Sequence, residues 1–542
     1  MSNASLRTKA PILINQACFL ALLERCKSMP ELKQIHALLI TFGLSDHHPF
    51  ASKVLSFSAV SSSGDIVYAN QFFLRLSDPT IFNYNTMIRA YSNSKNPNKS
   101  VSLFVDMLRV GVLPDYLTYP FLAKASARLS ELRLGGCIHG VILRNGFVSD
   151  RFVSNSLIHM YGSCGDARSA RKLFDEIPTR NLVSWNTMLD GYAKCGKLDL
   201  MKEVFDLMLE RDVVSWSSLV DGYVKGGEYM EALAVFDGMK AEGQKANEVT
   251  LVSVLCACAH LGALEQGRLM HRYIVENRLP STLVLTTSIV DMYAKCGAID
   301  EALFVFHGFP KRKTDVLIWN AIIGGLATHG FVQESLEMYV EMQSLGVRPD
   351  EITYLCLLSA CVHGGLVKKA WYFFDSLSKN GMTAKAEHYA CMIDVLARAG
   401  LLLEAYKLVS QMPIEPTASM LGALLNGCIH HGDLNLAEVV GKKLIELEPD
   451  HDGRYVGLSN VYAIGRRWAE ARTMREVMET RGVKKFPGFS FVEIGGTLHR
   501  FIAHEKMHPK CEHIYMILDA IITQMRPATD TETQELILNL TF

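Results

Sequence analysis

A repeating unit of 31 to 35 residues constrains the fold of this chain more than any other feature of its sequence. Three aligned copies of its central part are SLIHMYGSCGDARSARKLFDEIP (156–178), TMLDGYAKCGKLDLMKEVFDLM (187–208) and SIVDMYAKCGAIDEALFVFHGFP (288–310). Each copy has an apolar pair, an aromatic residue, a glycine and then a second amphipathic stretch. Apolar residues recur at spacings of three and four, which is typical of helices with one buried face. The unit therefore predicts a pair of short helices.

Small residues occupy fixed places in the unit. Glycine is expected to end the first helix because it readily adopts the left-handed backbone conformation. These glycines are Gly165, Gly196, Gly227 and Gly297. A small side chain within the second helix lets two helices approach closely. In three units this residue is Ala170, Ala232 or Ala302, and Met201 replaces it in a fourth.

Carried along the chain in the same phase, the repeat gives twelve units. They run 13–47, 48–80, 81–115, 116–150, 151–181, 182–212, 213–247, 248–282, 283–315, 316–350, 351–385 and 386–417. One pair of short helices cannot bury its own apolar face, whereas a stack of such pairs can. The expected fold is therefore all-α, a right-handed superhelical α-solenoid with a concave inner face. Residues 1–12 precede the array, a helical extension (418–488) follows it, and 527–542 form a polar tail.

Composition limits the classes of partner. Hydrophobic residues make up 49% of the 542 residues and charged residues 20%, which is enough for a continuous core. Since no apolar run reaches the roughly 18 to 20 residues that span a bilayer, we expect no membrane partner. The formal net charge is −1. An indiscriminate nucleic-acid binder would be far more basic, because phosphate neutralisation supplies most non-specific affinity. Any RNA binding must therefore rest on local patches and base contacts.

The cysteines and the N-terminus bear on the cellular compartment. Thirteen cysteines without a secretory signal favour a reducing compartment over a disulfide framework. Arg7 and Lys9 lie among serines and asparagines, with no acidic residue before Glu24. This start fits a short transit peptide and an unstructured segment equally well.

A β-hairpin and a helix are predicted after the helical extension. Residues 489–503 alternate apolar and polar side chains around Gly495-Gly496, a two-residue turn signal. Pro509 suits the first turn of a helix that runs to about Met525. The hairpin and helix could dock a partner, cap the open apolar end of the solenoid, or do both.

Several segments resemble the plant pentatricopeptide repeat family, in its subclass with alternating standard, long and short repeats. FNYNTMIRAYSNSKNPNKSVSLFVDMLRVGVLPD (82–115) resembles the standard unit, and EVTLVSVLCACAHLGALEQGRLMHRYIVENRL (248–279) resembles the long one. Residues 418–488 resemble the E-type extension and 489–526 the E-plus motif. The resemblance implies a protein of mitochondria or chloroplasts, with mitochondria favoured, that recognises single-stranded RNA and directs cytidine-to-uridine editing. It implies no enzymatic activity and no cofactor.

The same resemblance implies which residues read the bases. Helical repeats of this kind read one base each. In the family, the fifth residue of a unit separates purines from pyrimidines, and the last residue contacts the Watson–Crick edge. The informative pairs are Asn85 with Asp115 (U), Asn155 with Asn181 (C), Asn186 with Asp212 (U), Ser217 with Asn247 (A), Thr287 with Asp315 (G) and Asn320 with Asp350 (U). Pro120, Val252 and Leu355 make the long units spacers, whereas Ser52 with Thr80, and Ala390, are ambiguous.

Since the family places the final short repeat four nucleotides upstream of the edited cytidine, the expected target is 5′-U-n-C-U-A-n-G-U-n-n-n-n-n-C-3′. The same residues have a simpler interpretation. Asparagine and aspartate beside a helix start are commonly caps. The two roles are compatible.

The sequence lacks the ligands of a zinc deaminase, which are a His-x-Glu and a Cys-x-x-Cys. His508, Cys511 and His513 cluster near the C-terminus, where the E-plus resemblance implies a structural role. Cys164, Cys195 and Cys296, and likewise His36, His139 and His271, each share one phase of the repeat and are expected to pack between helices. The chain stops at Phe542 without a deaminase-like domain. The resemblance therefore implies a DYW-type deaminase and other editing factors as partners in trans.

The sequence is compatible with three functions. The first is an editing specificity factor. The second is an RNA splicing or stability factor, against which the E-type extension argues. The third is a protein–protein scaffold, whose inner face would carry peptide-binding residues in place of a base code.

Overall fold

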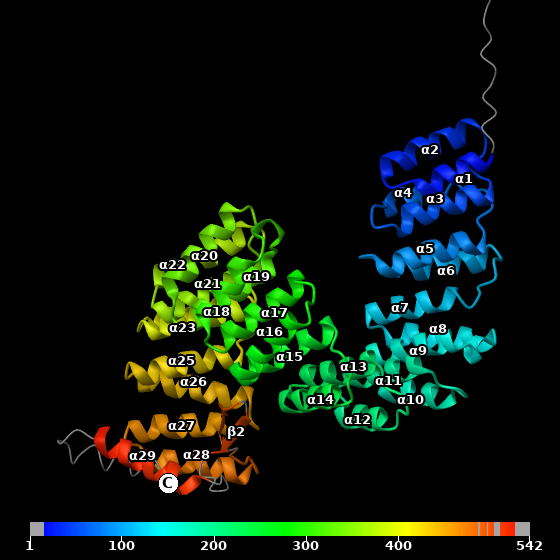
Figure 1. Ribbon diagram of the computed structural model, residues 1–542. Coiled ribbons are helices and arrows are strands. Elements are labelled where there is room, and N and C mark those ends of the chain that lie inside the picture. The colour runs from blue at the N-terminus through cyan, green and yellow to red at the C-terminus, as the bar shows by residue number, and fades with distance from the viewer. Residues whose placement is uncertain (1–15, 486–487, 496, 503–509, 526–542) are drawn as a thin grey trace, which may run out of the picture. The chain divides into compact units, whose positions relative to one another are not determined.

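The computed structural model describes residues 16–485, 488–495, 497–502 and 510–525 (Figure 1). The chain forms two compact units, Met1–Ser253 and Val254–Phe542, with the boundary inside one helix, α15. Each of the twelve repeats contributes two successive helices, from α1–α2 to α23–α24. The expectation of an all-α solenoid of helix–turn–helix repeats with a small C-terminal hairpin is confirmed.

The described part of the first unit contains fourteen α-helices and the start of a fifteenth. They are α1 (Gln16–Arg25), α2 (Met29–Thr41), α3 (His48–Val60), α4 (Ile66–Phe73), α5 (Ile81–Asn93), α6 (Asn98–Arg109), α7 (Thr118–Leu129), α8 (Leu132–Arg144), α9 (Arg151–Ser163), α10 (Ala167–Glu176), α11 (Leu182–Lys194), α12 (Leu198–Asp206), α13 (Val213–Lys225), α14 (Tyr229–Ala241) and the boundary helix α15 (Glu248–Leu261). The first helices of successive repeats pack on one another, and α7, α9, α11 and α13 are one such series.

The second unit continues the array and adds the C-terminal extension. Its repeat helices are α16 (Leu264–Glu276), α17 (Leu283–Lys295), α18 (Ile299–Gly308), α19 (Val316–Thr328), α20 (Val332–Ser344), α21 (Glu351–Gly364), α22 (Val367–Lys379), α23 (Ala386–Arg398) and α24 (Leu402–Gln411). The extension contains α25 (Ala418–His430), α26 (Leu434–Leu447), α27 (Asp452–Ile464), α28 (Trp468–Thr480), β1 (Phe489–Ile494), β2 (Thr497–Ile502) and α29 (Cys511–Met525). No helix among these described residues is long and apolar enough to cross a membrane.

Aromatic pairs join several repeats to the next. A phenylalanine of the second helix meets the tryptophan of the following first helix edge to face. The ring centroids of Phe174 and Trp185 are 4.9 Å apart, and those of Phe306 and Trp319 are 4.8 Å apart. Ala170, Ala232, Ala302 and Met201 are all fully buried in the second helices, as their shared phase predicts.

Glycine is required at two kinds of position. The four glycines expected to end the first helices, Gly165, Gly196, Gly227 and Gly297, all have positive φ, between 64° and 82°. Between α9 and α11 the backbones are nearly in contact. A Cβ on Gly162 would lie 2.5 Å from the Cα of Gly191, so only glycine fits there.

The shared histidines link a long repeat to the one that follows. His139 Nδ1 and His271 Nδ1 each lie 3.0 Å from a tyrosine hydroxyl of the next repeat, that of Tyr161 or Tyr293. His36 makes the same kind of contact with Tyr68. Burial lowers the pKa of all three rings. The expected packing role is therefore confirmed.

The C-terminal hairpin reaches back to the repeats. Its strands are antiparallel, with Phe489 opposite Ile502, and Gly495 has φ +59° in the turn. Glu493 of β1 accepts hydrogen bonds from the backbone nitrogens of Glu265 (2.8 Å) and Gln266 (3.1 Å). These nitrogens belong to the first turn of α16, whose N-cap residue, an alanine, has no capping oxygen. A carboxylate at a helix N-terminus is stabilising, so Glu493 acts as a cap supplied from a distant part of the chain.

The last helix, α29, ends at Met525, as predicted. The prediction also named Gly496, Pro509 and His508, which lie outside the described residues. Cys511 is buried at the start of α29.

Candidate nucleic-acid interface

The fifth and last residues of a repeat meet where one repeat joins the next. In four of the six pairs a hydrogen bond links them. Asn85 Nδ2 donates to Asp115 Oδ1 (2.9 Å), Asn186 Nδ2 to Asp212 Oδ1 (3.1 Å), Asn320 Nδ2 to Asp350 Oδ1 (2.9 Å) and Ser217 Oγ to Asn247 Oδ1 (3.2 Å). Side chains 26 to 30 residues apart in sequence therefore form single polar groups.

The other two pairs are not joined in this way. No hydrogen bond connects Asn155 to Asn181 or Thr287 to Asp315 among the described contacts. The hydroxyl of Thr287 donates instead to the backbone oxygen of Leu283 (2.8 Å). The Oδ1 atom of Asn155 is buried without a partner.

The capping interpretation holds for the last residue and is wrong for the fifth. Asp212 and Asp350 are N-caps in capping boxes, and each binds the residue three positions later. Asn85, by contrast, lies inside α5, whose N-cap is Thr80. Burial alone would raise the pKa of Asp212, but hydrogen bonds from Ser215 and Asn186 lower it, so this carboxylate is charged at neutral pH.

An exposed apolar residue occurs at one position in nine successive repeats, 81–115 to 351–385, which include all six that carry the polar pairs. It is the second residue of the unit, and it is 40% to 59% exposed. The nine residues are Phe82, Leu117, Phe152, Val183, Val214, Val249, Val284, Leu317 and Ile352. Residues three apart lie on one helix face, so each of these side chains neighbours the fifth residue. Sequence reasoning missed them, although an apolar residue outside the buried phase is a readable signal.

A hollow of about 410 Å³ shows how these residues combine. Val183 and Val214, the second residues of two neighbouring repeats, both line it. Asn186 and Asp212, the polar pair between them, line it as well. The Oδ1 atom of Asn186 is buried there without a hydrogen-bond partner. The hollow therefore has apolar walls and a polar end, which suits a planar ring with polar edges.

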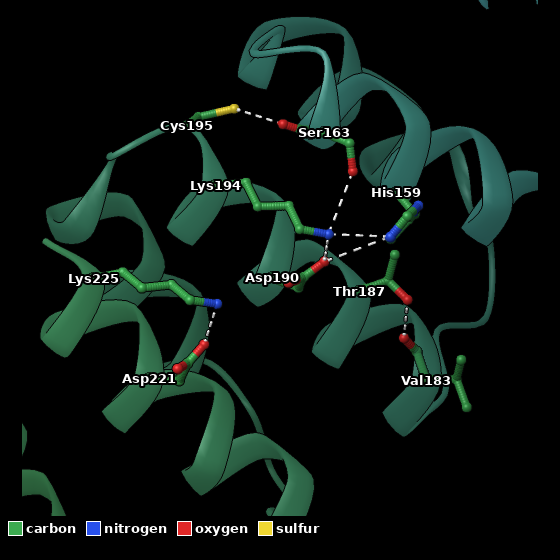
Figure 2. A network of polar contacts seen from close by, with 10 residues as sticks. His159, Ser163, Val183, Thr187, Asp190, Lys194, Cys195, Asp221 and Lys225 are labelled. Atoms are coloured by element: carbon green, nitrogen blue, oxygen red, sulfur yellow. Dashed lines mark hydrogen bonds and ion pairs between the residues drawn. The ribbon is translucent and has the colours of Figure 1, made fainter. Parts of the chain in front are cut away.

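Acid–base pairs continue the stripe toward the other end of the first helix (Figure 2). Lys194 Nζ lies 2.6 Å from Asp190 and 3.1 Å from His159, and the figure shows Val183 and Thr187 further along the same helix. Equivalent pairs are Lys225 with Asp221 (2.6 Å), Lys295 with Asp291 (2.9 Å) and Arg398 with Asp394 (2.9 Å). Burial, and then the charge of Lys194, lower the pKa of His159, so this ring is neutral near pH 7.

Models of protein families match most of the chain. The PPR repeat matches residues 152–182, 183–213, 284–313, 352–382 and 387–415, and the PPR repeat family matches 79–128, 211–260 and 314–363. The E motif matches residues 431–493. Pentatricopeptide repeat-containing protein At5g08305 of Arabidopsis thaliana is 58% identical over 94% of this chain and 96% of its own length. The chain belongs to the pentatricopeptide repeat family.

Other pentatricopeptide repeat proteins of Arabidopsis thaliana are similar over comparable lengths. At2g22410, named mitochondrial, is 39% identical over 94% of this chain and 90% of its own length. At2g42920, named chloroplastic, is 43% identical over 92% and 89%. Among solved structures, the maize pentatricopeptide repeat protein PPR10 in complex with an 18-nucleotide psaJ RNA element is 18% identical. It aligns with 86% of this chain and 91% of its own, at a TM-score of 0.45.

The cysteines of this pentatricopeptide repeat protein are suited to packing. Burial raises the pKa of Cys258 and of Cys356 to about 12, so both thiols stay protonated at neutral pH. Cys164 and Cys195 follow the last residues of their first helices, as their shared phase predicts. Among the residues that the structure describes, no group of three or more potential metal ligands comes together.

Proposed function

We propose that this pentatricopeptide repeat protein binds single-stranded RNA sequence-specifically in an organelle and serves as a site-recognition factor for cytidine-to-uridine editing. The observation that carries the proposal is the hollow in which Val183 and Val214 flank the Asn186–Asp212 pair. A nucleobase has two apolar faces and a polar edge, so the hollow matches it in chemistry.

Each part of the stripe then has a role toward one nucleotide. The exposed apolar side chains of neighbouring repeats contact the two faces of a base, a contact that tolerates any base. The fifth and last residues hydrogen-bond to its edge and select among bases. The cations of the Asp–Lys pairs lie about two turns further along the first helix than the fifth residue, where the phosphate of the same nucleotide is expected. A formal net charge of −1 is compatible with this arrangement, because the cations are local.

The bases assigned to the six pairs give the target 5′-U-n-C-U-A-n-G-U-n-n-n-n-n-C-3′, whose last cytidine is edited. The residues proposed to read it are Asn85, Asp115, Asn155, Asn181, Asn186, Asp212, Ser217, Asn247, Thr287, Asp315, Asn320 and Asp350. Four of the six pairs are joined by hydrogen bonds in the protein, which supports their acting as units.

The editing role rests on the C-terminal extension. The E motif matches residues 431–493, and the 542 residues contain neither the His-x-Glu nor the Cys-x-x-Cys of a zinc deaminase. We assign the deamination to a separate DYW-type deaminase. The extension also offers an apolar helix to such a partner, since Met516, Ile517 and Met525 of α29 are each more than half exposed.

Transcript sequencing in plants that lack this protein tests the proposal. We expect editing to be lost at one or a few organellar cytidines that follow the predicted pattern, in mitochondria or, alternatively, in chloroplasts. Loss of splicing or altered transcript ends, with editing unchanged everywhere, would instead establish an RNA splicing or stability factor.

A chain truncated after Lys485 separates binding from recruitment. It retains every repeat, and the Glu493 cap that it loses lies on the second helix of a spacer repeat, so we expect it to bind the RNA normally and to fail to restore editing. Restored editing by the truncated chain would remove the recruitment role of the hairpin and α29.

A further inference from the structure

A threonine of the following repeat holds three of the proposed base-reading residues. Thr118, Thr250 and Thr353 are the third residues of long repeats, and all three are fully buried. Thr118 Oγ1 donates to Asn85 Oδ1 (2.7 Å) and Thr353 Oγ1 donates to Asn320 Oδ1 (2.7 Å). The hydroxyls of Thr250 and Ser217 are 2.6 Å apart. Each contact crosses from one repeat to the next.

We propose that these threonines are positioning residues that fix which polar group the fifth residue presents to the base. The amide of Asn320 lies between two partners. Asp350 can only accept, so it takes an N–H of the amide, and Thr353 supplies a proton to the amide oxygen. Rotating the amide by half a turn would set its oxygen against the carboxylate oxygen of Asp350 and lose that bond. Thr353 would then have to accept from the amide N–H and turn its own proton to Asp350 Oδ1, which lies 3.0 Å away. The side chain is therefore held in one orientation before RNA arrives.

The short repeats offer a natural comparison within the same chain. Asn155 and Asn186 are followed by Ser184 and Ser215 at the third position. These serine hydroxyls reach only the last residue, Asn181 (3.0 Å) or Asp212 (2.8 Å). The amide oxygens of Asn155 and Asn186 are consequently buried without a partner. The asparagines at the fifth position thus occur in two states. In one state both the amide nitrogen and the amide oxygen are hydrogen-bonded, and in the other at most the nitrogen is.

The consequence concerns specificity and not affinity alone. Asn85 with Asp115, Asn186 with Asp212 and Asn320 with Asp350 are all assigned to uridine. The first and third of these pairs are held by threonine, and the middle pair is not. A held amide discriminates better, because the wrong base then leaves a buried polar group unpaired. We expect the preference for U over C to be about tenfold greater at the first and eighth positions of the target than at the fourth.

The experiment measures binding of the full chain to RNA oligonucleotides that carry each base in turn at the fourth and eighth positions. Thr353→Val removes the hydroxyl and keeps the shape. We expect it to reduce the U-over-C preference at the eighth position about tenfold, to the wild-type level at the fourth, with the preference elsewhere unchanged. Thr353→Ser should recover part of the preference. Thr353 bonds the last residue, Asp350, as well as the fifth, whereas Ser215 bonds only the last residue, Asp212. Ser215→Ala therefore controls for loss of the bond to the last residue, and we expect a much smaller change in preference at the fourth position than Thr353→Val causes at the eighth.

The positioning role rests on the proposed RNA binding, and a different result would overturn each of them. If the wild-type chain bound none of the oligonucleotides, the proposed function would fail. If it bound them with equal U-over-C preference at the first, fourth and eighth positions, or if Thr353→Val kept its preference, the positioning role would be overturned. The comparison within the wild-type chain needs no substitution, so a folding defect in Thr353→Val cannot hide the answer. Thr118→Val provides a second, independent site.

Discussion

The repeat array and the C-terminal extension are both built from helix pairs, yet their first helices carry different surfaces. In the array, α11 presents Val183, then Asn186, then the Asp190–Lys194 pair along one stripe. In the extension, the residues at the second and fifth positions are Ser419 and Gly422 in α25, and Gly453 and Val456 in α27. The same scaffold therefore exists with and without the proposed base-reading stripe. The fold therefore supports the proposed function, while the residues on one face of each first helix determine it.

The polar groups of the extension interact with each other. Glu438 of α26 binds Lys442 (2.8 Å) and Arg467, which joins α26 to the start of α28. Hydrogen bonds from Lys442 and then from Arg467 lower the pKa of Glu438 to about 2. In the array, cations such as Arg268 also link helices, but those at the thirteenth position of a repeat, such as Lys194 and Lys225, pair within one first helix and continue the apolar stripe. The array therefore keeps a set of cations next to the proposed RNA path in addition to those that hold its helices together.

The largest expected effect comes from charging the walls of the base hollow. We expect Val183→Asp combined with Val214→Asp to weaken binding of the target RNA about a hundredfold or more, since two base contacts are lost. Aspartate in the first turn of a helix is compatible with folding. Ser419→Asp makes the same change at the equivalent position of the extension and should leave affinity unchanged. Fluorescence anisotropy measures the affinity of both variants for the target RNA. Equal losses in the two variants would contradict the proposed difference between the array and the extension.

A substitution at a fifth residue should redirect the chain without weakening it. Thr287→Asn converts the pair with Asp315 to the combination assigned to uridine. We expect the preference at the seventh position of the target to shift from G to U by about tenfold, since one hydrogen-bonded edge contact changes. Oligonucleotides that differ only at that nucleotide measure the shift. A uniform loss across all four bases would show that Thr287 supports the fold and does not read the base.

The cations should contribute affinity without specificity. We expect Lys194→Ala, Lys225→Ala and Lys295→Ala each to weaken binding two- to fivefold, about equally for matched and mismatched RNA. Each should reduce the salt slope by about 0.7, the value for one phosphate contact on a single strand. Lys442→Ala in the extension is the matched control and should leave the slope unchanged. An altered base preference in Lys194→Ala would contradict this division of roles.

The smallest expected effect concerns the acid stability of the extension. The pKa of Glu438 is lower in the folded protein than in the unfolded chain, so its contribution to stability is present above about pH 4.5 and is lost as the pH falls toward 2. Glu438→Gln should therefore flatten the dependence of the unfolding free energy on pH between about 5 and 3. Urea unfolding at several pH values measures it. An unchanged slope would show that this ion pair contributes nothing to folding.

Local features of the fold could be predicted from the sequence, because the repeat imposes them on neighbouring residues. The helix-ending glycines, the buried alanines and the hairpin around Gly495 follow from short-range backbone preferences. The fifth and last residues could be placed by phase alone. Contacts between repeats could not be predicted in the same way. The bond from Thr353 to Asn320 depends on how two helices 33 residues apart in sequence rest against each other.

Two further features needed the structure for a similar reason. The capping of α16 by Glu493 joins segments 228 residues apart, and no local pattern marks a glutamate for that role. The exposure of Val183 and its counterparts also contradicts the simple rule that apolar residues of an amphipathic helix are buried. The sequence shows them as apolar, but only the packing shows that the second position points away from the core.

The most direct test of the central claim compares two RNAs with the purified full-length chain. One carries 5′-U-n-C-U-A-n-G-U-n-n-n-n-n-C-3′, and the other has the six assigned positions permuted at constant composition. We expect the permuted RNA to bind at least about a hundredfold more weakly at physiological salt, because several edge contacts are lost together. Equal affinity for the two RNAs would contradict the claim that the fifth and last residues of the repeats read bases.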